Sequence, residues 1–198
     1  MMARWLVWLL AGVAAVAIGI GARMWLTPAE PEPGSAVGRG VAAIGGPFRL
    51  VDQKGQVRTD EDFRGQFMLV YFGYTYCPDV CPTAIQVMSV ALDQLGDAGR
   101  DVIPILVTID PERDTVEKLA AYAQNFHPRL VAFTGDVEAV RAAARAYRVY
   151  YAKAGDGPDY LMDHTSIIYL MGRDGRYLAH FTHTTDPSTM AERIRSFL

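Results

Sequence analysis

Cysteine is scarce in this sequence: 198 residues contain only two, Cys77 and Cys81, set four positions apart. Two cysteines cannot form a framework of several disulfides, so the stability of the chain must come from another source. They are also too few for a closed zinc site made of cysteine alone, which needs four protein ligands. Any cysteine chemistry in this protein is therefore concentrated in one pair.

The sequence also lacks a strong charge bias, with 19 basic and 22 acidic residues. Two of the basic residues, Arg4 and Arg23, flank the N-terminal apolar run. The remainder of the chain therefore has a small excess of acidic residues. It contains no basic stripe, so we expect no nucleic-acid partner. It contains no internal repeat either, and roughly 150 residues from Pro47 onward suit one domain with a sizeable core.

A charge-free run extends from Trp5 to Ala22, which is 18 residues. As a helix it would span about 27 Å, close to the hydrocarbon core of about 30 Å. We predict that residues 1–26 form a single transmembrane anchor in the cytoplasmic (inner) membrane, with the C-terminal domain on the periplasmic side. The alternative is a cleaved signal peptide, since Ala15-Val16-Ala17 resembles a cleavage site. Both interpretations export the rest of the chain.

The segment 27–46 is rich in proline, glycine and alanine and has no apolar period, so it is predicted to be a flexible tether. The domain then occupies residues 47–198. We expect its elements in this order: a hairpin (48–52 with 56–59), strand 66–72, helix 83–95, strand 101–109, helix 114–126, strand 131–134, helix 136–147, strand 149–152, a second hairpin (165–171 with 176–181) and helix 186–198. This order indicates an α/β fold in which a central mixed sheet is flanked by helices on both faces and has an antiparallel edge.

The two cysteines lie between a buried strand and a helix, and each immediately precedes a proline. Because a residue before proline is pushed away from helical geometry, we interpret the segment as a loop rather than a helix face. Pro78-Asp79 fits a type I turn and Pro82 fits the first helical position, which would place Cys81 at or near the N-cap. Both sulfurs would then lie at a helix N-terminus, where the dipole favours the thiolate.

Three motifs in this order resemble the Sco/SenC family of membrane-anchored copper proteins, within the thioredoxin superfamily. They are the cysteine loop Tyr71–Thr83, the segment Val107–Thr115 and the segment Asp163–Ser166. The resemblance extends from about Gly46 to the C-terminus. It implies a thioredoxin-like fold with an N-terminal β-hairpin extension.

The resemblance also implies a copper site formed by Cys77, Cys81 and His164, with one copper ion, Cu(I) or Cu(II), per domain. It implies delivery of that copper to the binuclear copper centre of cytochrome c oxidase during assembly. The expected partners are the copper-receiving oxidase subunit, a thiol reductant or other copper chaperone, and the membrane. We expect a metallochaperone rather than an enzyme.

The residue chemistry is consistent with copper but leaves alternatives open. Two thiolates and an imidazole form a soft ligand set that suits Cu(I), and with an added oxygen they can hold Cu(II). Zinc with a bound water is the rival metal, and a plain structural disulfide is a further alternative. A loop with three intervening residues constrains little chain entropy, so a disulfide there would add little stability. This favours a chemical role for Cys77 and Cys81.

His164 taken alone could be a packed or solvated side chain rather than a ligand. It stands just before the strand 165–171, where thioredoxins usually carry a cis-proline that faces the cysteines, and the nearest proline here is Pro158. We interpret His164 as a ligand that replaces the residue gripping disulfide substrates. The other histidines have default assignments: solvated surface for His180 and His183, and a helix C-terminal cap favoured by the dipole for His127.

Other residues near the motifs have two interpretations each. Three aromatic residues either shield a metal or belong to the core and rim: Phe72, Tyr74 and Tyr76. Two acids either orient ligands or serve as turn and loop residues: Asp79 and Asp163. The segment Asp110–Thr115 is interpreted as a structural turn with a helix cap, and a partner-docking surface is the alternative.

Two function classes remain open. The first is an assembly factor that carries copper, and the second is a thiol:disulfide oxidoreductase in which Cys77 and Cys81 are the redox-active pair and keep the cysteines of an oxidase subunit reduced. Both use the same thiols, and oxidation to a disulfide removes two of the three copper ligands. A peroxidase is a weaker third class, because there is no separate resolving cysteine.

Overall fold

The computed structural model describes residues 43–198. The predicted anchor and most of the predicted tether therefore lie outside the described residues. Within the described part, no helix combines the length and the apolar character that crossing a membrane requires. At the end of the segment predicted as the tether, Ile44 packs against the core and the Gly45 N–H donates to the Ala146 carbonyl at 2.9 Å.

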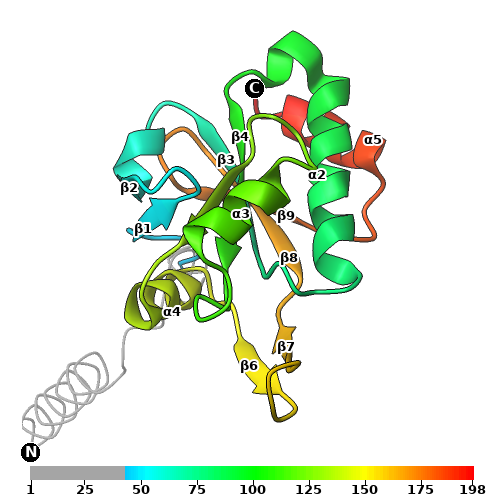
Figure 1. Ribbon diagram of the computed structural model, residues 1–198. Helices are drawn as coiled ribbons and strands as arrows, with labels where there is room; N and C mark the ends of the chain where they lie inside the picture. The colour runs from blue at the N-terminus through cyan, green and yellow to red at the C-terminus, as the bar shows by residue number, and fades with distance from the viewer. Residues whose placement is uncertain (1–42) are drawn as a thin grey trace, which may run out of the picture. The chain divides into compact units, whose positions relative to one another are not determined.

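The main sheet has seven strands in the order β2-β1-β5-β4-β3-β8-β9 (Figure 1). Their bounds are β1 Arg49–Asp52, β2 Val57–Thr59, β3 Phe67–Gly73, β4 Val102–Thr108, β5 Val131–Thr134, β8 Ile167–Met171 and β9 Tyr177–Thr182. The central strands β3, β4 and β5 are parallel, and antiparallel strands extend the sheet on both sides. This confirms the mixed sheet and places the N-terminal hairpin β1–β2 beside β5 as one of its edges.

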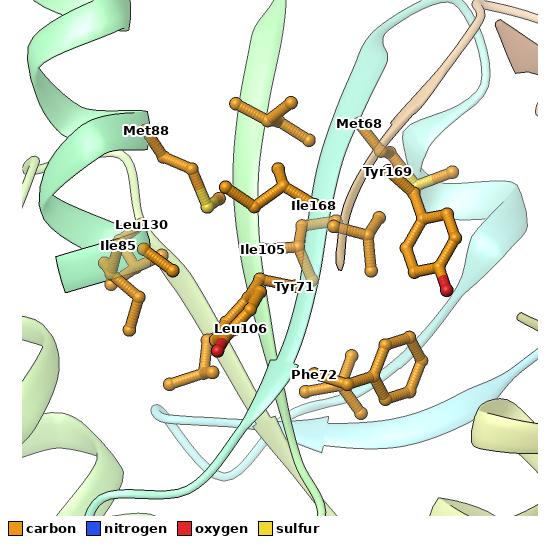
Figure 2. Packing of buried hydrophobic residues seen from close by; sticks show 14 of the residues in the cluster. Met68, Tyr71, Phe72, Ile85, Met88, Ile105, Leu106, Leu130, Ile168 and Tyr169 are labelled. Atoms are coloured by element: carbon orange, nitrogen blue, oxygen red, sulfur yellow. The ribbon is translucent and has the colours of Figure 1, made fainter. Parts of the chain in front are cut away.

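The central strand β3 is buried along its whole length, as its unbroken apolar sequence predicts. Neighbouring side chains on a strand point to opposite faces. Tyr71 points toward Ile85 of α2, while Phe72 lies on the other face, with its ring centre 5.3 Å from that of Tyr147 (Figure 2). The two faces of the sheet therefore have separate apolar layers.

Four α-helices cover the sheet: α2 Val80–Leu95, α3 Val116–Ala123, α4 Val137–Ala146 and α5 Pro187–Arg195. Residues 43–198 also contain two short 3-10 helices, η1 Asp60–Phe63 and η2 Gly96–Gly99. The segment after α3 contacts α2 through a bond from the His127 N–H to Ser89 Oγ at 3.2 Å. Tyr147, which ends α4, packs on the opposite face against Phe72. Helices therefore flank both faces, as predicted.

The largest departure from the predicted elements is a separate two-stranded sheet, β6 Tyr151–Ala154 with β7 Leu161–His164. Figure 1 shows it projecting beyond the end of the main sheet. The strand predicted from the sequence at 149–152 begins two residues before β6, and β7 was not predicted. The reason is that β7 is short, buries only Met162 and has no clear apolar alternation, so only its pairing with β6 defines it. We call β6, β7 and their turn the ligand hairpin.

Candidate metal centre

The first two candidate ligands lie where β3 gives way to α2. Helix α2 begins at Val80 with Asp79 as its N-cap, so Cys81 lies inside the first turn and Pro82 follows it there. Cys81 is thus near the N-cap, as predicted, but the prediction that Pro82 is the first helical residue is wrong by two positions. The first turn tolerates this proline because an N–H there has no intrahelical acceptor to lose.

The structure brings Cys77, Cys81 and His164 together. Their three ligand atoms all lie within 4.8 Å of one another. Cys81 Sγ is 3.5 Å from His164 Nε2, and the Cys81 N–H donates to Cys77 Sγ at 3.4 Å. Both thiols are free, with Cys81 buried and Cys77 half-buried. The cluster thus has one solvent-accessible sulfur and one covered sulfur.

His164 is the last residue of β7, and its ring is fixed on several sides. Its Nδ1 donates to the Thr165 carbonyl at 3.1 Å, so Nε2 is the ring nitrogen that faces the sulfurs. The rings of Tyr71 and Tyr74 meet the imidazole edge-on, with centres 6.1 and 6.0 Å away. Tyr74 is buried, so it covers the imidazole from solvent, in line with the shielding interpretation of this residue.

The two thiols have opposite protonation preferences. A hydrogen bond from the Cys81 thiol, helped by His164 and by the backbone N–H groups of Asp79 and Cys81, outweighs burial and lowers the pKa of Cys77 to about 3. Cys81 donates that bond and is buried, and both effects raise the pKa of its thiol. The prediction that the helix N-terminus favours a thiolate at both positions is therefore wrong for Cys81. A metal ion would have to displace its proton.

The cysteine loop is bonded to the main sheet by a buried carboxylate, Asp114. It accepts from the Thr75 N–H at 3.1 Å, from Thr75 Oγ1 at 2.5 Å and from Thr108 Oγ1 at 2.6 Å. Sequence reasoning placed Asp114 at the start of a helix, but Thr115 caps α3 by accepting from the Lys118 N–H at 3.3 Å. Thr115 directly follows Asp114 and can also cap a helix, and this second candidate is the signal that could have separated the two roles.

Several predicted neighbours of the metal lie elsewhere. Phe72 faces the opposite side of the sheet and cannot shield the site, whereas Tyr76 is 49% exposed and donates its hydroxyl to Asp159 at 2.9 Å. His180 is exposed and bonded to Tyr177, so it is surface, as expected. We expected the helix dipole to stabilise the charged form of His127. Burial instead lowers the pKa of this side chain and so favours its neutral form.

The donor set fits a soft metal ion. Within residues 43–198, these three side chains are the one group of three or more potential metal-binding residues close enough to share an ion. A closed zinc site would need a fourth protein ligand, whereas Cu(I) accepts two or three soft donors. Cys77 is only half-buried, so part of this ligand is exposed to an incoming group.

Comparison with known proteins identifies relatives along most of the chain. The family model SCO1/SenC matches residues 37–198. An SCO2-like protein of Rickettsia conorii is 35% identical over 192 residues, covering 93% of this chain and 94% of that one. The human mitochondrial SCO1 homolog is 42% identical over 163 residues, covering 80% of this chain and 54% of that one.

Solved structures give the same result. The structure of Bradyrhizobium japonicum ScoI with copper bound has a TM-score of 0.74 and 41% identity, covering 79% of this chain and 100% of that one. Arabidopsis thaliana ScoI with copper bound has a TM-score of 0.74 and 36% identity, covering 78% of this chain and 97% of that one. The family match, the sequence relatives and the shared fold agree: this chain belongs to the SCO1/SenC family.

Proposed function

We propose that this protein binds one copper ion through Cys77, Cys81 and His164 and delivers it to the binuclear copper centre of cytochrome c oxidase during assembly. The observation that carries the proposal is the cluster of three soft or borderline ligand atoms within 4.8 Å of one another. The solved structures of two relatives with copper bound support the choice of metal.

The geometry suits copper as cargo rather than as a permanent cofactor. Cys77 is half-buried, and only one of the three ligands, Cys81, is fully buried. A two- or three-coordinate Cu(I) ion can accept a further thiolate or imidazole from a partner before its first bonds break. An acceptor such as the oxidase subunit could therefore take the ion by ligand exchange at the Cys77 side.

The proposal includes a location. A membrane anchor formed by residues 1–26 and a tether formed by residues 27–46 would hold the copper-binding domain on the periplasmic side of the inner membrane. Membrane fractionation combined with protease access from each side tests this. The anchored form should sediment with membranes and be cut only from the periplasmic side, whereas a shortened soluble protein would support a cleaved signal peptide.

The alternative function is a thiol:disulfide oxidoreductase that reduces the metal-binding cysteines of the oxidase subunit. The lowered pKa of the half-buried Cys77 favours it, because a thiolate is the attacking species. In that reaction Cys77 attacks the partner disulfide and Cys81 resolves the mixed disulfide, so the partner gains two thiols and this pair becomes a disulfide. His164 stands just before β8, where thioredoxins carry the proline that grips disulfide substrates, so we rank this activity second.

A copper titration of the exported domain tests the main proposal. With the thiols reduced, we expect one tightly bound Cu(I) per domain, and with the pair oxidised we expect none. Equal copper binding in both redox states would rule out the thiolates as ligands. Reduction of a generic disulfide as fast as by thioredoxin would instead reverse the ranking of the two functions.

A further inference from the structure

The turn between β4 and α3 contacts the ligand hairpin as well as leading into a helix. Tyr160 of the hairpin donates its hydroxyl proton to Asp110 Oδ1 at 2.6 Å. Lys153 Nζ donates to Glu112 Oε2 at 2.6 Å. These contacts matter because β6 and β7 pair only with each other among the described strands. Apart from its chain connections to α4 and β8, the hairpin is therefore held by side chains.

Arg113 lies at the centre of this contact. Its Nε donates to Asp110, and its Nη1 donates to the Pro158 carbonyl at 3.3 Å. The guanidinium carbon is 3.6 Å from the centre of the Tyr160 ring and 4.6 Å from the centre of the Tyr76 ring. One planar cation thus contacts both the ligand hairpin and the cysteine loop.

The environment of Arg113 differs from that of a surface ion pair. Its side chain is only 17% exposed, and Asp110 is 2% exposed. Its Nη2 is buried and has no hydrogen-bond partner within residues 43–198, so aromatic faces supply the remaining contacts of the guanidinium. A flat guanidinium can stack on a ring and donate in its own plane at the same time, whereas a lysine ammonium has no such planar fork. The contact therefore depends on shape as well as charge.

The hairpin links this contact to the metal centre. Tyr160 directly precedes β7, whose last residue is His164, and His164 pairs with Tyr151 in β6. Tyr160 and His164 lie four residues apart in one short segment, so a displacement of Tyr160 is passed along β7 toward the imidazole. We propose that Arg113 is a positioning residue that holds His164 over the cysteine pair; this rests on the proposed copper-binding function. The turn 110–113 then has a specific role that the structural and partner-docking interpretations did not include.

The test compares Arg113→Met with Arg173→Met in the reduced exported domain. Arg173 is a matched control because it also pairs with an aspartate, Asp101, and stacks on an aromatic ring, Phe67, at the opposite end of β3. We expect Arg113→Met to weaken Cu(II) binding about tenfold, within the range for groups that orient a metal ligand, and to remove the nitrogen coupling from the Cu(II) spectrum. Arg173→Met should change neither.

Two further measurements separate positioning from a general loss of stability. In a His164→Ala background, Arg113→Met should cause no additional loss of Cu(II) affinity, because the ligand it positions is already absent. Arg113→Lys should behave like Arg113→Met rather than restore binding. Full additivity of the two substitutions, or full restoration by lysine, would overturn the proposal.

A readout without metal keeps this proposal distinct from copper binding itself. Hydrogen exchange of residues 151–164 should accelerate in Arg113→Met, with exchange in β3 and β4 unchanged. If the unmodified domain bound no copper, the proposed function would fail, while the exchange result would still decide whether Arg113 fixes the hairpin. Unchanged exchange in the hairpin would contradict the positioning role.

Discussion

The two segments that supply the candidate ligands are held in different ways. The cysteine loop lies between β3, which is buried along its length, and α2, and Asp114 bonds it to the main sheet. The ligand hairpin has no main-sheet neighbour and is held by side chains such as Tyr160 and Arg113. The sulfurs therefore belong to the rigid core, and the imidazole belongs to a separately positioned element.

This difference suggests that the two segments contribute differently to the binding of Cu(I) and Cu(II). Cu(I) can remain on two thiolates, so the rigid pair suffices to retain it. Cu(II) prefers nitrogen and oxygen donors, so it depends more on the hairpin that carries His164. A movement of the hairpin would then alter one oxidation state more than the other. Four predictions test this comparison.

The largest effect is expected from removing the rigid pair. Cys77→Ser and Cys81→Ser should each abolish tight Cu(I) binding, because a hydroxyl is a hard and weakly acidic ligand. The intense thiolate-to-copper absorption of the Cu(II) form should also disappear. Met88→Leu is the control, since it removes a buried sulfur from α2 while nearly conserving volume. Copper content after gel filtration and visible spectra report the result, and unchanged copper in both serine variants would eliminate the site.

The next effect concerns the base of the cysteine loop. Asp114→Ala should lower the free energy of unfolding by roughly 2 to 4 kcal/mol, because the half-buried Thr75 N–H and the buried Thr108 hydroxyl lose their acceptor. Asp136→Ala is the control, as it removes only an exposed cap of α4 and should cost about 1 kcal/mol. Urea unfolding measures both, and equal losses would mean that Asp114 is no more than a helix cap.

Removing the imidazole should separate the two oxidation states. We expect His164→Ala to weaken Cu(II) binding by about 10- to 100-fold and to leave most Cu(I) affinity in place. His180→Ala, which alters an exposed histidine, is the matched control and should have no effect. Competition with a chromophoric chelator measures each affinity. Equal losses for both ions would show that the sulfurs and the imidazole act as one unit.

The smallest effect is a difference in reactivity between the two sulfurs without metal. Because the pKa of Cys77 is about 3, its thiolate should persist from pH 7 down to pH 5 and be lost only as the pH falls through that value. Cys81 is fully buried and its pKa is raised, so it should react at least about ten times more slowly with iodoacetamide. Pulse labelling with mass spectrometry measures the ratio. Comparable labelling at pH 6 would contradict the assigned protonation states.

The fold could be predicted wherever local pattern and tertiary packing agree. The apolar run of β3 indicated a strand buried on both faces, and Asp136 and Asp186 marked two helix starts that the structure shows. The prediction failed for β7, because its four residues, of which only Met162 is buried, carry no period and depend on β6 for their strand pairing. The prediction also failed at the start of α2. This helix begins at Val80, two residues before the start that was predicted from Pro82.

The sequence by itself determined which residues can do the chemistry: two cysteines in a strand-to-helix loop and a histidine before a late strand, in an order that resembles one family. Only the tertiary structure decided that Cys77 and Cys81 have opposite pKa shifts, because this depends on which thiol donates and which is buried. Only the structure assigned Asp114 and Arg113 to the two ligand-bearing segments, because their partners lie 39 and 47 residues away in the chain, at Thr75 and Tyr160. Contacts over such separations follow from how strands and helices pack, and no local pattern encodes them.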